Sequence, residues 1–580
     1  MNKKKNLFVR LFAVGTAASL LLSVTGCAKT DGSDNDATPP AATEEELTAV
    51  RDGLVKKSQT EGLGDISKLE FYENGERTAA AEMNTARDNK IVYYAGDIKR
   101  VVNYPDGYII DIPQDWAPDY SMSPLKVRYS NDDVLVTISV EDVVEKDARL
   151  HLEKYVNKYI LDEKYQAKNR VTQLADVEEY PCSGGYTAQI VRLRMERMPD
   201  GSKPYFTYVN IFSERTKYYR FLFRSNEPVE NLYDIIDSFD HISEKGLAVY
   251  NMEYHISEPA NWTEETAELY HRICNSNTYE FGMYPANIEE SGYNFNVPAF
   301  EERTNYFMPI ISQYIHSGSD GGTLNMDFYQ RLHDEGRILQ LTYQYTASNN
   351  MGLDGYSVTL DIYRGLMDEQ LRSFARQVKE YGHPVLFRLN NEMNSDWTSY
   401  CALANMADTD IFVDTWVRLY NICQEEGANN MIWIFDPNTG SFPPGTWTNV
   451  LNYMPPAEYM HMVGLTAYCT GYKEFDSWKD MYAQALSELK PFFQDDEWPI
   501  CIPEYGCGKG DGTRSEEQYA WIEQMFQQTK EMPQIKYGVW FSANDYNLED
   551  DSILNYYHID VREKGLMEAF RKGLASLGKK

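Results

Sequence analysis

The second half of the sequence predicts an α/β fold of the (β/α)8 TIM barrel type. From about residue 246 onward, short and continuously apolar strands alternate with amphipathic helical stretches, which is typical of a parallel sheet covered by helices. Residues 246–580 are roughly 330 residues long and contain eight such units, the number of strand–helix units in a TIM barrel. A doubly wound sheet is the alternative, but no Gly-x-Gly-x-x-Gly follows a strand, so nothing favours a nucleotide-binding fold.

The eight expected strands follow one another at intervals that leave room for a helix after most of them. In chain order they are YEFGMY from residue 279, YFMPIIS from 306, RILQLTY from 337, PVLFRL from 384, MIWIF from 431, MVGLT from 462, PICIP from 499 and KYGVWFS from 536. Residues 363–382 and 408–427 have helical spacing, and the second stretch reaches Gly427, a residue typical of helix ends.

The first 27 residues are typical of a bacterial export signal. The basic stretch MNKKKNLFVR precedes the short apolar stretch LFAVGTAASLLLSV. The following LLSVTGC resembles a lipoprotein signal, which implies that Cys27 is lipidated and becomes the mature N-terminus. An ordinary signal peptide with an incidental cysteine is the alternative. Residues 28–45 are polar and acidic and indicate a flexible tether. We therefore expect an exported protein, lipid-anchored to the cell membrane and facing outside.

Residues 46–245 predict a smaller α+β domain, here called the accessory domain. Strands are expected near residues 107, 133, 185, 205 and 218, and helices near 149 and 229. Consecutive strands with short turns favour an antiparallel sheet with helices on it, loosely similar to the PsbP/Mog1 type. This domain carries no catalytic constellation, so we expect a spacer or a module that binds cell-surface protein or glycan partners.

Charge and cysteine content narrow the class of partner. The chain has 55 basic and 88 acidic residues, a formal net charge of −33, which argues against nucleic-acid binding because phosphates require basic patches. Seven cysteines follow Cys27, an odd number whose pairing the spacing leaves open. No Cys-x-x-Cys or His-Glu-x-x-His is present, and we expect neither a metal nor a cofactor.

Two glutamates follow strands that lie across a barrel mouth from each other. Active sites of such barrels form at the carboxyl ends of the strands. Glu392 follows the fourth expected strand in RLNNEMN, and Glu504 follows the seventh in CIPEYG. Glycoside hydrolysis needs two facing carboxyl groups, one to protonate the leaving oxygen and one to meet the charge at the anomeric carbon. Asp436 and Asn438 also follow a strand, but a structural role is favoured for each.

The stretch PVLFRLNNEMNSDW resembles the acid–base segment of glycoside hydrolase family 26, a β-mannanase-like family of clan A. WPICIPEYGC is similar to its nucleophile strand. The resemblance spans about residues 270–550 and implies a retaining glycosidase in which Glu392 is the acid–base and Glu504 the nucleophile. It also implies that substrate contacts come from a set of side chains near these two: Arg388, Asn391, Trp397, Tyr468, Trp540, Tyr343 and Gln344.

Two positions depart from the family pattern. The family usually has His immediately before the acid–base Glu, where this chain has Asn391, and a Trp-His pair after the third strand, where it has Tyr343 and Gln344. Both changes fall on sugar-contacting positions, so the sugar, the linkage and the choice between endo and exo action stay open among β-mannan and related β-glycans. The alternative function is a non-catalytic glycan-binding lipoprotein on a hydrolase scaffold, against which the intact pair of glutamates argues.

Overall fold

The structure is a computed structural model, and residues 42–580 form one compact unit in it. It describes residues 69–73, 76–78, 90–95, 97–119, 123–242, 258–285, 289–318, 322–347, 355–493, 498–546 and 552–578. The expected export signal with Cys27 and the tether of residues 28–45 lie outside this described part.

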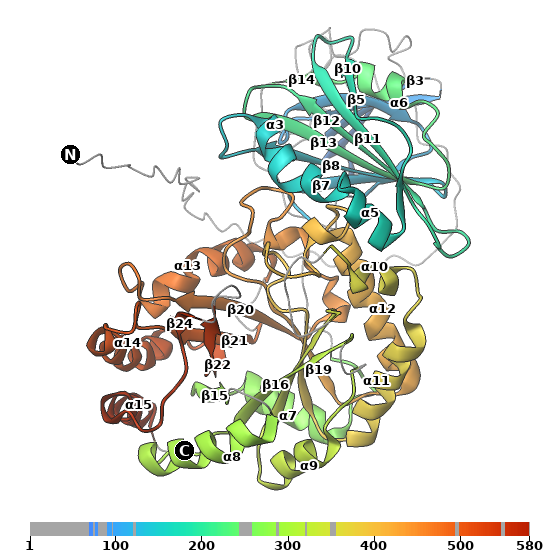
Figure 1. The fold of residues 1–580 in the computed structure, drawn as a ribbon. Coiled ribbons are helices and arrows are strands. Elements are labelled where there is room, and N and C mark those ends of the chain that lie inside the picture. The colour runs from blue at the N-terminus through green and yellow to red at the C-terminus, as the bar shows by residue number, and fades with distance from the viewer. Residues whose placement is uncertain are drawn as a thin grey trace, which may run out of the picture. The chain divides into compact units, whose positions relative to one another are not determined.

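The accessory domain contains two antiparallel sheets, shown in blue to green in Figure 1. One sheet has the order β14-β5-β4-β3-β1-β2, and the other has the order β10-β11-β12-β13-β8-β7-β6 with β9 paired to β11. The strands of the first sheet are β1 (Leu69–Glu73), β2 (Glu76–Thr78), β3 (Lys90–Ala95), β4 (Ile98–Asn103), β5 (Tyr108–Pro113) and β14 (Asp240–His241). Those of the second are β6 (Ala117–Asp119), β7 (Lys126–Ser130), β8 (Val134–Asp142), β9 (Val171–Gln173), β10 (Glu178–Pro181), β11 (Thr187–Met195), β12 (Tyr205–Phe212) and β13 (Lys217–Ser225).

The second sheet uses both of its faces, as the alternation of side chains along β13 shows. Tyr219, Phe221 and Phe223 share an apolar core with β4, β5 and α6 (Leu232–Asp237). Tyr218 and Leu222 alternate with them and join the core that continues into the second half of the chain. The remaining helical segments are α3 (Ala148–His151), the π-helical turn η2 (Leu152–Val156), α4 (Asn157–Ile160) and α5 (Glu163–Asn169). The predicted antiparallel domain with helices on it is therefore confirmed.

The second half forms a closed parallel barrel with the strand order β15-β16-β17-β18-β19-β20-β21-β22. Its strands are β15 (Glu280–Tyr284), β16 (Ile310–His316), β17 (Ile338–Gln344), β18 (Val385–Leu389), β19 (Met431–Phe435), β20 (Met462–Cys469), β21 (Ile500–Cys507) and β22 (Ile535–Phe541). All eight predicted strands are present. The second begins at Ile310 instead of Tyr306, because the preceding Pro309 has no N–H for the ladder.

Helices cover the outside of this barrel (Figure 1). They are α7 (Glu264–Cys274), α8 (Glu289–Thr304), α9 (Met326–Asp334), α10 (Val358–Tyr363), α11 (Asp368–Tyr381), α12 (Asp410–Glu426), α13 (Trp478–Leu489), α14 (Ser515–Gln528) and α15 (Lys564–Ser576). A small hairpin of β23 (Asn544–Tyr546) and β24 (Ile553–Tyr556) follows the last barrel strand. Helix α12 ends at Gly427, whose φ of 80° is the left-handed conformation that glycine adopts easily.

The barrel interior is apolar at the end where the strands begin. Ile310, Leu386 and Ile432 form a cluster there with Tyr270 and Ile273 of α7, so this helix closes that end. The chemistry therefore has to lie at the opposite end, as barrels of this type arrange it. Among the described residues no helix combines the length and apolarity needed to span a bilayer. All seven cysteines after Cys27 are described, and each is a free thiol.

Candidate active site

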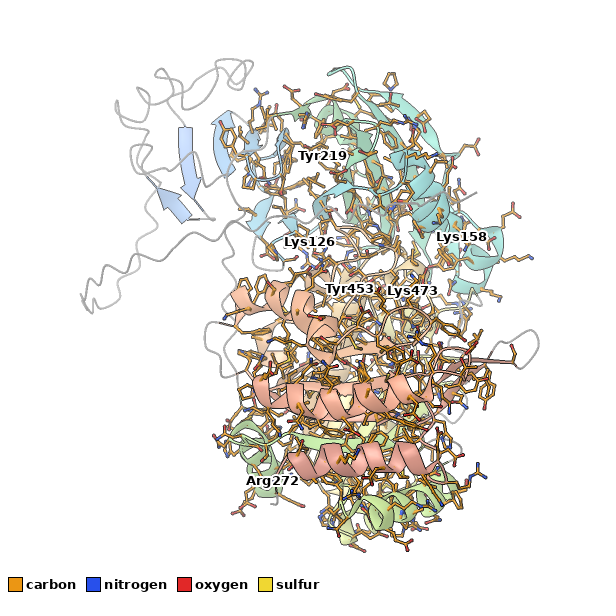
Figure 2. All side chains as sticks on the ribbon, turned by 90° about the vertical axis from the view of Figure 1, so that its left-hand side faces the viewer. Lys126, Lys158, Tyr219, Arg272, Tyr453 and Lys473 are labelled. Atoms are coloured by element: carbon orange, nitrogen blue, oxygen red, sulfur yellow. The ribbon has the colours of Figure 1, made fainter. Side chains whose placement is uncertain are left out.

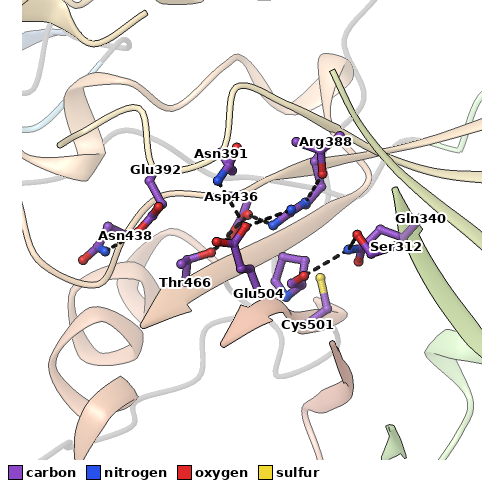
Figure 3. A network of polar contacts seen from close by, with 12 residues as sticks. Ser312, Gln340, Arg388, Asn391, Glu392, Asp436, Asn438, Thr466, Cys501 and Glu504 are labelled. Atoms are coloured by element: carbon purple, nitrogen blue, oxygen red, sulfur yellow. Dashed lines mark hydrogen bonds and ion pairs between the residues drawn. The ribbon is translucent and has the colours of Figure 1, made fainter. Parts of the chain in front are cut away.

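The two predicted carboxyl groups lie close together at the carboxyl end of the barrel strands (Figure 3). Glu392 stands three residues after the end of β18. Glu504 lies inside β21, because this strand continues to Cys507 beyond the predicted end. Both side chains are almost fully buried, with 6% and 5% of their surface exposed. The barrel thus brings together two glutamates that are 112 positions apart in the chain.

The backbone around Glu392 adopts a conformation that residues with a side chain rarely take. Asn390 and Glu392 have φ angles of 52° and 56°, which cost roughly 1–3 kcal/mol each. Neighbouring strands hold them in place: the N–H of Asn390 donates to the carbonyl of Tyr343, and the N–H of Glu392 donates to the carbonyl of Asp436, both at 2.9 Å. This strain is concentrated at the residue expected to transfer a proton.

Glu504 accepts hydrogen bonds from four side chains on three different segments of the barrel. The hydroxyl of Tyr468 donates to its Oε1 at 2.6 Å. Its Oε2 accepts from the hydroxyl of Tyr314 at 2.6 Å, from Nη2 of Arg388 at 3.0 Å and from Nδ2 of Asn391 at 3.1 Å. These donors fix the orientation of the carboxylate and complement a negative charge on it.

Glu392 has a different environment, dominated by burial. Its Oε1 accepts one hydrogen bond from Nδ2 of Asn438 at 2.7 Å. Burial and the nearby charge of Glu504 raise the pKa of Glu392 to about 8, against the hydrogen bonds from Asn438 and Trp397, which favour its charged form. This carboxyl group therefore keeps its proton at neutral pH. Two carboxyl groups with such different surroundings suit an acid and a nucleophile.

Arg388 lies beneath the pair and is completely buried. Its guanidinium bridges two carboxylates, with Nη1 at 2.7 Å from Asp436 and Nη2 at 3.0 Å from Glu504, and its Nε donates to Thr342. Asp436 in turn accepts from the hydroxyl of Thr466. Arg388 thus acts on the site by holding Glu504 from within the barrel.

Asn391 connects Glu504 to the end of β17. While its Nδ2 donates to Glu504, its Oδ1 accepts from Nε2 of Gln344 at 2.8 Å and from the hydroxyl of Tyr400 at 3.2 Å. Tyr400 also donates to the backbone carbonyl of Asn391 at 2.9 Å. The two positions that depart from the family pattern, Asn391 and Gln344, are therefore direct partners of each other.

Two residues predicted to contact substrate face away from the site. Tyr343 stacks on Phe374 of α11 with ring centroids 4.5 Å apart, because Thr342 and Gln344 occupy the inward positions of β17. Trp540 packs against Tyr505 and Phe570 on the helix side of β22. Side chains alternate along a strand, so the structure does not bring Tyr343 or Trp540 to the carboxyl pair.

Trp397 is 37% exposed and packs against Phe442 with ring centroids 5.1 Å apart. It is hydrogen-bonded to Glu392, so it lies at the solvent side of the acid. An exposed aromatic pair in this position suits stacking on a sugar ring.

Sequence reasoning missed three residues that contact the site. Tyr314 comes from β16, whose IISQYIH carries no acidic residue to draw attention. Phe541 is the aromatic residue of β22 that faces inward: it lies over Tyr284 at 5.1 Å and meets Tyr314 and Tyr468 edge to face. Asn438, for which a structural role was expected, is the hydrogen-bond donor to Glu392.

Residues 357–493 match the family model of glycosyl hydrolase family 26. The matched segment contains Glu392 and ends before Glu504. The family resemblance predicted from the sequence is thereby confirmed over residues 357–493. No curated protein matches the chain.

Several solved structures are similar to the chain. The mannanase man26 of Bacillus subtilis is 15% identical and has a TM-score of 0.36, covering 49% of this chain and 88% of its own. A GH26 β-mannanase from Bacteroides ovatus is 15% identical with a TM-score of 0.41, covering 54% and 94%. The catalytic domain of a GH26 endo-β-1,4-mannanase from Bacillus sp. JAMB-750 is 14% identical with a TM-score of 0.43, covering 56% and 92%.

Proposed function

We propose that this protein is a retaining glycoside hydrolase that cleaves a β-linked polysaccharide or oligosaccharide, β-mannan or a related β-glycan, by double displacement. Glu504 attacks the anomeric carbon and forms a covalent glycosyl-enzyme. Glu392 first protonates the leaving oxygen and then, as a carboxylate, removes a proton from the water that releases the sugar. We further propose that the enzyme works outside the cell, anchored by a lipid at Cys27.

One observation carries the proposal: the two carboxyl groups have opposite environments. Burial raises the pKa of Glu392 to about 8, so it can donate a proton at neutral pH. Glu504 faces four hydrogen-bond donors, one of them the Arg388 guanidinium. This difference between the two glutamates favours catalysis over the alternative of a binding protein. A site that only binds glycan does not need a buried, protonated acid next to a carboxylate that accepts four hydrogen bonds.

The roles of the two glutamates can be separated by the choice of leaving group. On a natural β-glycan, Glu392→Gln and Glu504→Gln are both expected to lose activity by at least ~10²-fold. On an aryl glycoside whose leaving group needs no proton, Glu392→Gln should still release the aryl alcohol in a first burst. Glu504→Gln should release none, because no glycosyl-enzyme forms. A loss of only a few-fold in either variant on the natural glycan would refute the assignment.

The stereochemical course tests the mechanism directly. Proton NMR of the first-formed product should show the β-anomer, since two displacements retain configuration. An initial α-anomer would mean direct attack by water and would refute the nucleophile role of Glu504. Product analysis on mannan, mixed-linkage glucan and xylan then identifies the sugar. Binding of one of these glycans without any release of product would favour the non-catalytic alternative.

A further inference from the structure

A second cluster of chemically active side chains lies at the opposite end of the barrel from Glu392 and Glu504. It consists of Glu265 in the first turn of α7, His333 in the last turn of α9, and His383 in the turn between α11 and β18. Their spacing along the chain forms no recognisable motif, so the cluster could not be predicted from the sequence. We propose that these three residues bind one divalent transition-metal ion, with Zn²⁺ the best fit.

The ligand atoms have the arrangement that such an ion needs. Nε2 of His333 lies 2.8 Å from Oε1 of Glu265, and Nδ1 of His383 lies 3.1 Å from its Oε2. One ligand atom from each residue lies within 4.8 Å of both others. Tetrahedral zinc with bonds near 2.1 Å places its ligand atoms about 3.4 Å apart, so small side-chain rotations suffice to admit the ion.

The two imidazole rings are held in a way that their hydrogen bonds alone do not explain. They stack face to face with centroids only 3.4 Å apart and planes inclined by 12°. Each directs one ring nitrogen to the same carboxylate, so the three side chains converge on one point. A metal ion at the convergence point satisfies both nitrogens with neutral imidazoles.

An acceptor also stands near the outer ring nitrogen of His333, as metal-binding histidines usually require. Nδ1 of His333 is buried and has no hydrogen-bond partner among the described residues. Oδ1 of Asp334 lies 3.9 Å from it. When the metal takes Nε2 of His333, the ring proton of His333 resides on Nδ1 and faces the carboxylate of Asp334.

The position indicates a structural ion. Helix α7 closes the apolar end of the barrel through Tyr270 and Ile273, and the ion would fasten its first turn to α9 and to the start of β18. Since the three side chains are partly exposed, water is available as the fourth ligand. The ion should therefore raise thermal stability and leave glycan hydrolysis unchanged.

The test uses the untagged full chain, stripped of metal and titrated with Zn²⁺ or Co²⁺. We expect one ion per chain, a rise of a few degrees in the thermal midpoint with excess Zn²⁺, and the visible absorption of four-coordinate Co²⁺. His333→Ala, His383→Ala and Glu265→Gln should each abolish all three effects; the exposed Glu265 carries the test if a histidine variant fails to fold. The matched control is His271→Ala, which removes a histidine of the same helix that pairs with Glu258 alone at 2.8 Å.

Two results would overturn the proposal. One is a wild-type chain that binds less than one ion at saturation or gives no Co²⁺ absorption. The other is a loss of binding in the His271 control equal to the loss in the cluster variants, which would mean adventitious binding by surface histidines. Activity of the glycosidase does not enter either readout, so the metal site and the proposed function can fail separately.

An independent set of contacts concerns residues 401–410, which follow Glu392 in the long connection between β18 and α12. The accessory domain holds the backbone of this segment. The hydroxyl of Tyr165 donates to the carbonyl of Ala404 at 2.9 Å, that of Tyr208 donates to the carbonyl of Met406 at 2.5 Å, and Arg220 donates to the carbonyl of Ala407.

The same segment ends in a buried ion cluster with the accessory domain. Lys126 and Arg128 of β7 each lie 2.6 Å from Oδ1 of Asp410, the first residue of α12. Nζ of Lys126 also donates to the carbonyl of Asn452 at 3.2 Å. Figure 2 labels Lys126 and Tyr453, the residue after Asn452. These partners are needed because Met406 and Ala407 have left-handed φ angles of 56° and 48°, which persist only where surrounding contacts enforce them.

We infer that the accessory domain positions the acid–base residue, an inference that rests on the proposed function. The held segment begins next to Tyr400, whose hydroxyl donates to Asn391, and Asn391 donates to Glu504. Releasing residues 401–410 should therefore let water reach Glu392 and loosen Asn391. The accessory domain is then part of the catalytic unit and not a spacer.

The test is the double variant Tyr165→Phe/Tyr208→Phe, which removes the two hydroxyl contacts and keeps the rings. We expect a fall in kcat with a smaller change in KM, a basic limb of the pH profile shifted to lower pH, and faster hydrogen exchange in residues 401–410. The control Arg170→Met breaks a contact to Asp361 of α10 and should change none of these. Unchanged kcat, pH limb and exchange in the double variant would refute the inference, whereas a wild type without hydrolysis would refute only the proposed function.

Discussion

Removing the hydrogen bond from Asn438 should move the pH profile of the enzyme in a predictable direction. Nδ2 of Asn438 donates to Oε1 of Glu392 at 2.7 Å, and this donor favours the charged form of the acid. Without it the pKa of Glu392 rises above its value of about 8. Because the acid must be protonated to act, the basic limb of kcat/KM moves to higher pH.

The size of the shift follows from the strength of the bond. A hydrogen bond to a charged group is worth about 1.5–3 kcal/mol, and one pKa unit corresponds to about 1.4 kcal/mol. Water entering the space of the lost side chain replaces part of the bond, so we expect a shift of about one pH unit for Asn438→Ala. Asn438→Asp should shift the basic limb further, because the new carboxylate puts a negative charge beside Glu392. One oxygen of this aspartate can still accept from the N–H of Gly440, as Oδ1 of Asn438 does at 2.9 Å.

The assay is kcat/KM against pH on a soluble β-glycan for the wild type and both variants. The order of the basic limbs should be wild type, Asn438→Ala, Asn438→Asp, from low to high pH. Asn261→Ala is the control, because the side chain of this exposed asparagine before α7 donates to Gln424 and Asn429 and not to the carboxyl pair. Limbs that stay in place, or that move to lower pH in both variants, would show that Glu392 is not the group that limits activity at high pH.

Three further outcomes are expected. Tyr468→Phe and Tyr314→Phe each remove one hydrogen-bond donor to Glu504 and should lower kcat/KM roughly ten- to a hundredfold. The rate is measured at saturating and at limiting glycan concentration. Activity equal to that of the wild type would contradict the role of these donors. Trp540→Phe should lower the thermal midpoint with little change in kcat/KM. Phe541→Ala should lower kcat/KM, because of these two residues it is Phe541 that faces Tyr314 and Tyr468. The reverse pattern would contradict the assignment of the two faces of β22. Glu392→Gln should raise the free energy of unfolding above pH 8 by a few kcal/mol and by little at pH 4, as measured by denaturant unfolding. The unfolded carboxyl loses its proton from about pH 4.5 upward while the folded one keeps it to about pH 8, so wild-type stability falls across this window and the variant escapes the fall; parallel pH profiles of stability would contradict the raised pKa.

The sequence could locate the proposed catalytic pair because each glutamate follows an apolar strand. The order of strands in a barrel then places Glu392 and Glu504 at the same end, whatever the details of packing. It could not decide which side chain of a neighbouring pair faces inward. Barrel strands are apolar on both faces, so Tyr343 and Gln344, or Trp540 and Phe541, look equally suitable until the register of the strand is known.

Asn391 illustrates what only the contacts reveal. In the sequence it is a departure from the family pattern beside Glu392. In the structure its amide donates to Glu504 and accepts from Gln344 and Tyr400. Gln344, the last residue of β17, also departs from the family pattern, so the two departures form one neutral hydrogen-bonded unit. A change in one would leave the other without its partner, so both should be exchanged together in any attempt to alter sugar preference.

The accessory domain was expected to be a spacer or a module that binds surface partners, because its own residues contain no catalytic pattern. Its role depends on what it touches: Tyr165, Tyr208 and Arg220 bind backbone carbonyls of residues 401–410, and backbone carbonyls leave no trace in a sequence. The strained residues Met406 and Ala407 point the same way, since neither is a residue type that favours a left-handed backbone. This segment needs outside contacts to keep its shape and follows directly after Glu392, so we expect hydrolysis by the barrel to depend on the domain before it.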